Sequence, residues 1–98
     1  MVDVAVICGS ASDEPIAEKV FRVLEESGVS YDYQVISAHR DPERLDEYLK
    51  ASDARTFIAI AGLSAALPGM VASKTERPVI GVPVSGKLMG IDALLSIA

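Results

Sequence analysis

His39 and Arg40, within the segment Ser37-Ala38-His39-Arg40-Asp41, carry the side chains best suited to chemistry in this sequence. Imidazole gains and loses a proton readily near neutrality, so His39 is a candidate general acid and base. Guanidinium presents a planar set of donors that fits phosphate, so Arg40 is a candidate anion ligand. A single histidine in a loop can equally be a solvated residue, and the segment by itself leaves both interpretations open.

A second candidate segment is Gly9-Ser10-Ala11-Ser12-Asp13, which follows an apolar run and leads into a predicted helix. Backbone N–H groups at the start of a helix favour an anion, and the two serine hydroxyls add donors. The Asp13 carboxylate would repel a phosphate but can accept hydrogen bonds from sugar hydroxyls, so a sugar phosphate fits both features. The alternative is that Ser12 and Asp13 only cap the helix.

Two further loops contain few charges and several small residues. The segment Gly62–Gly69 would let backbone approach a flat ligand closely, and it would equally suit the start of a helix packed on a sheet. The segment Ser85–Gly90 suits either a mobile cover or an ordinary exposed loop. Neither Gly-x-x-x-x-Gly-Lys-[Ser/Thr] nor Gly-x-Gly-x-x-Gly occurs, so the sequence does not predict either of these nucleotide-binding loops.

Apolar runs alternate along the chain with segments of helical periodicity, and each candidate loop follows one of these runs. Short apolar runs predict strands buried on both faces of a parallel sheet. The sequence therefore predicts an α/β fold, with residues 1–98 forming one domain: a three-layer, flavodoxin-like sandwich with strand order 2-1-3-4. The predicted strands are Val4–Cys8, Tyr31–Ile36, Thr56–Ala61 and Pro78–Val84; the predicted helices begin near Asp13 and Asp41 and cover Ala65–Ser73 and Ile91–Ile97.

The composition argues against several classes of protein. The chain has 98 residues, of which 50% are hydrophobic and 5% aromatic. Its net charge is −5 and it has no basic cluster. The negative charge and the few aromatic residues argue against nucleic-acid binding. One cysteine, Cys8, and one histidine predict no disulfide and no metal site. There is no basic leader at Met1 and no apolar run near the roughly 20 residues of a membrane span, so we expect a cytoplasmic protein that does not bind membranes.

The four loops together resemble one known family. Its signatures Gly-Ser-x-Ser-Asp and Ser-Ala-His-Arg-x-Pro are similar to residues 9–13 and 37–42, and its third-strand loop is similar to residues 61–70. Its fourth strand and following helix match residues 78–84 and 90–97. The chain thus resembles the PurE family of N5-carboxyaminoimidazole ribonucleotide mutases (class I AIR carboxylase-like enzymes) over nearly its whole length.

The resemblance implies an isomerase of de novo purine biosynthesis that needs no metal or organic cofactor. It moves a carboxylate from the exocyclic nitrogen of an aminoimidazole ribonucleotide to carbon 4 by decarboxylation and recarboxylation. By motif, His39 would be the catalytic acid and base, with Asp13 on the ribose hydroxyls. The remaining substrate-binding residues implied are Ser10, Ser12 and Arg40, which would hold the 5′-phosphate, and Gly9, Ser37, Ala38, Ala61, Gly62 and Leu67.

Three alternatives remain beside the mutase. A sister class that uses free carbon dioxide has Lys after the histidine and Arg in the third loop; Arg40 and Leu63 occupy those places here and favour the mutase. The second alternative is a related carboxylase that acts on another ring. The third is a non-catalytic fragment that binds a sugar phosphate or serves in assembly.

The resemblance also implies features that this sequence lacks. Ala66 stands where the family commonly has His, and family members continue past Ile97 with a fifth strand and a long helix. The family forms octamers, and the fourth predicted strand is an apolar edge, so we expect a homo-oligomer or a further segment of chain to cover it.

Overall fold

The computed structural model describes residues 2–62 and 66–84, so the predicted helix Ile91–Ile97 and the loop Ser85–Gly90 lie outside the described residues. The elements are, in chain order, β1 (Val4–Cys8), a 3₁₀ turn (Ala11–Asp13), α1 (Glu14–Glu26), β2 (Tyr31–Val35), α2 (Pro42–Ala51), β3 (Thr56–Ala61), α3 (Ala66–Lys74) and β4 (Val79–Pro83).

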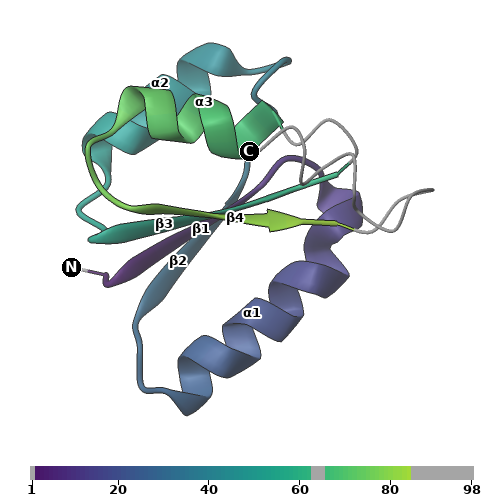
Figure 1. The fold of residues 1–98 in the computed structure, drawn as a ribbon, viewed down its shortest axis with the longest axis vertical. Coiled ribbons are helices and arrows are strands. Elements are labelled where there is room, and N and C mark those ends of the chain that lie inside the picture. The colour runs from purple at the N-terminus through teal and green to yellow at the C-terminus, as the bar shows by residue number, and fades with distance from the viewer. Residues whose placement is uncertain (1, 63–65, 85–98) are drawn as a thin grey trace.

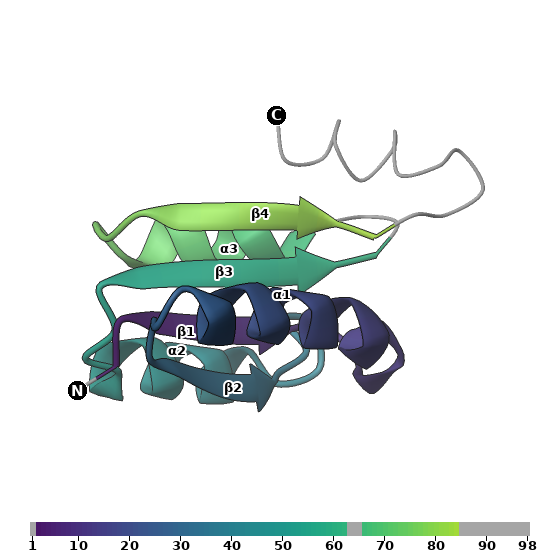
Figure 2. The same cartoon turned by 90° about the horizontal axis from the view of Figure 1, so that it is seen from below.

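The four described strands form one parallel sheet in the order β2-β1-β3-β4, which confirms the predicted α/β fold and strand order. Helix α1 covers one face of the sheet, while α2 and α3 cover the other (Figure 1). All four strands run in the same direction, so their carboxyl ends lie along one edge of the molecule (Figure 2). Ligand sites in open parallel sheets form at that edge.

Two apolar clusters hold the three layers together. Every residue of β1 is buried, and its alternate side chains enter opposite clusters, as expected for a strand covered on both faces. On the α1 side, Val20, Phe21 and Leu24 pack against the sheet, at the spacing of an apolar stripe along one face of a helix. On the other side, Leu45 and Leu49 of α2 and Val71 of α3 are buried.

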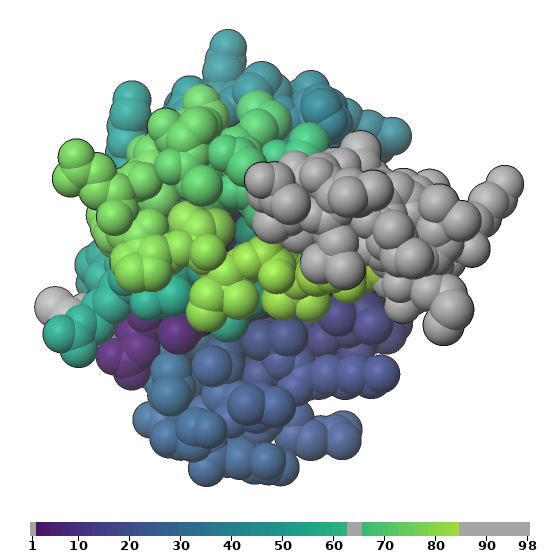
Figure 3. All heavy atoms as spheres, in the orientation of Figure 1, coloured from purple at the N-terminus to yellow at the C-terminus, as the bar shows by residue number. Residues whose placement is uncertain are grey.

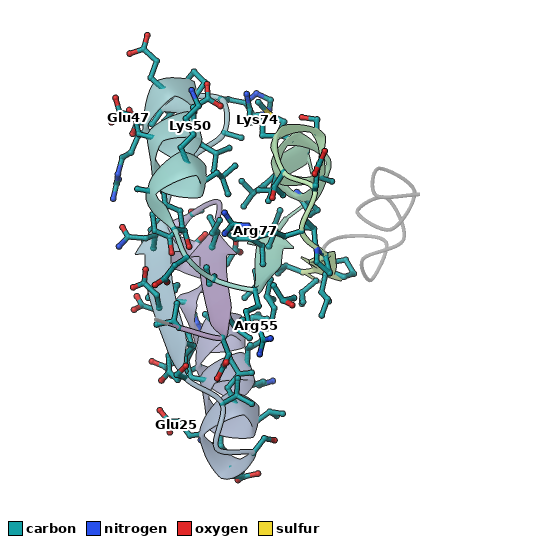
Figure 4. The ribbon with its side chains drawn as sticks, turned by 90° about the vertical axis from the view of Figure 1, so that its left-hand side faces the viewer. Glu25, Glu47, Lys50, Arg55, Lys74 and Arg77 are labelled. Carbon is teal, nitrogen blue, oxygen red and sulfur yellow. The ribbon has the colours of Figure 1, made fainter. Side chains whose placement is uncertain are left out.

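At the end of the sheet away from the candidate loops, Gly28 ends a helix and the Arg77 side chain links two loops. Gly28 ends α1 with a φ of 70°, in the left-handed region that favours glycine. Arg77, labelled in Figure 4, donates 2.8 Å hydrogen bonds to the carbonyls of Ser52 and Ala54. Its guanidinium also lies 5.4 Å from the centre of the Phe57 ring. These contacts tie the loop before β4 to the connection between α2 and β3.

In the space-filling view, β4 lies at the surface between α3 and α1 (Figure 3). Among the described strands it pairs only with β3, and Ile80 is 52% exposed. Val23 of α1 is 61% exposed. The apolar edge that the sequence predicts is therefore present in the described residues.

None of the described helices is long and apolar enough to cross a membrane.

Candidate active site

Three of the predicted loops meet at the carboxyl ends of β1, β2 and β3 around a cavity of about 300 Å³. Ten of the eleven predicted site residues line it, and Ala66 of α3 joins them. They are Gly9, Ser10, Ser12, Asp13, Ser37, Ala38, His39, Ala61, Gly62 and Leu67.

The eleventh predicted residue, Arg40, lines a neighbouring cavity of about 490 Å³. This second cavity shares Gly9, Ser10 and Ser37 with the first, so the two cavities adjoin along that line of residues. Asp41 lines the second cavity as well. We refer to the first as the histidine cavity and to the second as the arginine cavity.

Backbone and hydroxyl contacts shape the first loop. Gly9 N donates to the Ile60 carbonyl at 3.0 Å, which holds the loop against β3. Ser10 Oγ accepts from Ser12 N at 3.3 Å and lies 2.9 Å from Ser12 Oγ, so the two hydroxyls form one small polar group. Asp13 N donates to the Ser10 carbonyl at 3.1 Å and closes the 3₁₀ turn. This turn precedes α1, and the sequence did not indicate it.

Asp13 occupies the N-cap position of α1, but its side chain makes no capping hydrogen bond. The alternative that Asp13 serves as a side-chain cap is therefore wrong. Partial burial raises the pKa of the Asp13 carboxyl above its ordinary value. A carboxylate that lines a cavity without a helix partner is available to accept hydrogen bonds from a ligand.

The second loop is held by Ser37. Ser37 Oγ accepts from Arg40 N at 3.1 Å, and the Ser37 carbonyl accepts from Asp41 N at 2.9 Å. Ala38 is buried beneath the loop, whereas His39 and Arg40 are exposed. The turn thus leaves the imidazole and the guanidinium accessible, each at its own cavity.

The floor of the histidine cavity is small and apolar. Ala61 is buried at the end of β3, and the buried Leu67 of α3 packs beside Gly9. A Cβ placed on Gly9 would lie 3.7 Å from Leu67 Cδ2, an ordinary contact distance. Sequence reasoning did not include Ala66 among the site residues, although its position four residues after Gly62 at the start of a predicted helix was a usable signal.

Cys8 lies at the carboxyl end of β1, is fully buried, and packs in the apolar cluster on the α1 side of the sheet. Burial raises the pKa of its thiol, as expected for a cysteine that packs as a small apolar residue. The described residues contain no group of three or more His, Cys, Asp or Glu side chains placed to hold a metal ion. The groups at hand are an imidazole, a carboxylate, clustered hydroxyls and a guanidinium.

Comparisons with known proteins agree with the motifs. Residues 3–98 match the family model described as AIR carboxylase. The N5-carboxyaminoimidazole ribonucleotide mutase of Methanocaldococcus jannaschii is 57% identical over 93 residues, which cover 95% of this chain and 59% of that protein. The protein of the same name from Pyrococcus horikoshii is 52% identical over 98 residues, covering 96% and 55%.

A crystal structure of Treponema denticola PurE superposes with a TM-score of 0.88 at 33% sequence identity, covering 97% of this chain and 63% of that one. The fold is thus shared with a solved structure. The chain spans a little over half the length of the curated relatives named above.

Proposed function

Because this chain belongs to the AIR carboxylase family, as its motifs predict, we propose that it acts as an N5-carboxyaminoimidazole ribonucleotide mutase in purine biosynthesis. The observation that carries this proposal is the meeting of His39, Asp13 and a small apolar floor in one cavity, with Arg40 in the adjoining one. These two adjoining cavities support the proposal, because their residue types suit a sugar phosphate that carries a reacting ring.

In the proposed reaction His39 transfers one proton in each direction. As the bond between the exocyclic nitrogen and its carboxylate breaks and carbon dioxide leaves, His39 protonates that nitrogen. Carbon 4 of the ring then forms a bond to carbon dioxide, and His39 removes the proton from carbon 4. The net change is an isomerisation. Ala61 and Gly62 line the cavity where carbon dioxide would be retained between the two steps.

The rest of the substrate would lie along the two cavities. Ser10, Ser12 and Arg40 supply the hydroxyl and guanidinium donors that suit the 5′-phosphate. Asp13 would accept hydrogen bonds from the ribose hydroxyls, a role supported by its position in the cavity lining and by the absence of a capping hydrogen bond on its side chain. Gly9, Ser37, Ala38, Gly62 and Leu67 complete the proposed contacts as lining residues.

The test is His39→Asn in a direct mutase assay. We expect turnover to fall by about 100- to 10,000-fold, because a positioned acid and base typically contributes that much. Binding of ribose 5-phosphate, which needs no proton transfer, should remain within about twofold of the unsubstituted protein. Turnover that stays at the unsubstituted level would remove His39 from the mechanism.

A carbon dioxide-dependent AIR carboxylase is the second candidate, because the matching family model carries that description. Supplying the decarboxylated ribonucleotide with bicarbonate, beside the N5-carboxylated substrate, separates the two activities. Rapid product formation only from the decarboxylated substrate would favour the carboxylase. Binding of ribose 5-phosphate without product from either substrate would favour a non-catalytic module. Product from a different ring, in the same side-by-side assay, would identify a related carboxylase.

We also propose that the active protein is a homo-oligomer, and the family resemblance implies an octamer. The exposed Ile80 on β4 supports the proposal, because unprotected apolar strand edges promote association. Light scattering after size exclusion measures the mass directly. A stable monomer over a wide concentration range would contradict it.

A further inference from the structure

Asp41 is an exposed acidic residue that lines the arginine cavity, whose other polar lining residues carry hydrogen-bond donors suited to an anion. Arg40, Ser10 and Ser37 line this cavity together with Asp41. Asp41 occupies the N-cap position of α2, where an aspartate normally accepts a hydrogen bond from a backbone N–H of the first turn. Here its side chain makes no capping hydrogen bond, so its oxygens are available to accept a hydrogen bond from a ligand.

The protonation state of a phosphate decides whether such a carboxylate repels it or binds it. A fully ionised oxyanion offers only acceptors, so an ionised carboxylate beside it has no proton to accept and repels it. A phosphate monoester has a second pKa of about 6, and below that value it carries one P–O–H donor. That donor can bond to a carboxylate while guanidinium and hydroxyl groups bond to the other oxygens.

We propose that Asp41 is a specificity-determining residue that accepts a hydrogen bond from the acidic proton of a singly ionised phosphate group. This inference rests on the proposed function, in which the arginine cavity holds the 5′-phosphate. In that arrangement Arg40 and the serine hydroxyls donate to the ionised oxygens, and Asp41 accepts from the protonated one. The cavity then selects protonated phosphate over fully ionised oxyanions of the same shape, such as sulfate.

The other charged groups around the cavity do not supply this selectivity. Arg40 favours any anion, and a protonated His39 would do the same. Asp13, from the first loop, opposes any anion. On α2, Arg44 donates to Gln34 Oε1 at 3.0 Å and to the Val35 carbonyl at 3.2 Å. These groups change the affinity for phosphate and sulfate alike, so the ratio of the two affinities reports on the acceptor.

The experiment titrates the protein with inorganic phosphate and with sulfate at about pH 5.5, below the second phosphate pKa of about 6 for a monoester. Backbone amide shifts of Gly9 and Arg40 report binding at the cavity. The variants are Asp41→Asn, whose amide has nearly the same shape, and Glu43→Gln. Glu43→Gln is a matched control. It also removes one negative charge at the start of α2, but Glu43 is an exposed residue that does not line the cavity.

We expect the unsubstituted protein and Glu43→Gln to bind phosphate about tenfold or more tightly than sulfate, the range of one hydrogen bond to a charged group. Asp41→Asn should bring the two affinities within about threefold of each other, chiefly by strengthening sulfate binding. Asparagine is as good an N-cap residue as aspartate, so the variant should keep its fold.

An unchanged phosphate-to-sulfate ratio in Asp41→Asn would overturn the role of Asp41 and leave the proposed mutase function intact. Equal affinities for phosphate and sulfate in the unsubstituted protein would also overturn the role of Asp41. Failure of both anions to bind would overturn the role of Asp41 and the phosphate position together. The mutase assay with His39→Asn is independent of these titrations, so loss of the proposed function is recognised separately.

Discussion

Asp13 separates two physical accounts of the first loop, and removing its carboxylate tests them. A side-chain cap contributes typically about 1 kcal/mol to stability, and its loss to alanine would cost that amount. Asp13 makes no capping hydrogen bond, so Asp13→Ala loses only the attraction between its charge and the start of α1, about 0.3 to 1 kcal/mol. Relief of the burial that raises the pKa of Asp13 offsets that loss. We expect the free energy of unfolding to change by less than about 0.5 kcal/mol.

The pH dependence has a definite sign. Because the pKa of Asp13 is raised in the folded protein, burial of the charged carboxylate lowers stability at neutral pH. That penalty appears as the pH rises through the raised pKa and is absent below the ordinary value of 3.8. Relative to the unsubstituted protein, Asp13→Ala should therefore be more stable at neutral pH than in acid. Urea unfolding at several pH values measures the difference.

Ligand binding provides the second half of the test. Asp13→Ala should weaken ribose 5-phosphate by about tenfold or more, because hydrogen bonds from sugar hydroxyls to a carboxylate are lost. Inorganic phosphate, which has no sugar, should bind at least as tightly as before, since a negative charge has been removed. A loss of about 1 kcal/mol in stability with unchanged ribose 5-phosphate affinity would refute this reasoning and restore the capping account.

Three further predictions concern side chains packed at the sheet, those of Tyr33, Tyr48 and Cys8. Tyr33→Phe should leave the free energy of unfolding unchanged or raise it by up to about 1 kcal/mol, because the buried hydroxyl of Tyr33 makes no hydrogen bond of good geometry and interacts with the Cys8 thiol, a weak partner; a clear loss in urea unfolding would contradict this. Tyr48→Phe is the matched change and should lower stability by about 1.5 to 3 kcal/mol, since Tyr48 donates a 2.7 Å hydrogen bond to the Asp32 carboxylate. Cys8 should react with a thiol reagent only on unfolding, because the thiol is buried and its pKa is raised; labelling of the folded protein at the rate of a free thiol would disprove it.

The strands and the position of the site could be predicted because they depend on local patterns. β1 and β3 are short runs of apolar residues, and the structure has both within the predicted bounds. β2 and β4 end one residue before the predictions, at Val35 and Pro83. The parallel order brings three of the candidate loops to one edge, so residues far apart in the sequence line one cavity.

Other features depend on packing that the sequence does not display. The 3₁₀ turn before α1 forms through hydrogen bonds at Ser10, Ser12 and Asp13, whose residue types equally predict an ordinary cap. The unpartnered hydroxyl of Tyr33 results from its place beneath α1, where Phe21 packs edge-on at 4.8 Å between ring centres. Neither propensity nor periodicity specifies such contacts.

His39 and Arg40 show the same limit at the site itself. They are neighbours in the sequence, yet they line different cavities that adjoin along Gly9, Ser10 and Ser37. A ligand that occupies both cavities crosses these shared residues. A Cβ at Gly9 would meet only ordinary contacts, so packing alone does not require glycine there. In the proposed binding mode a sugar would pass Gly9 on its way from a phosphate at Arg40 to a ring at His39, and that passage would favour a residue without a side chain.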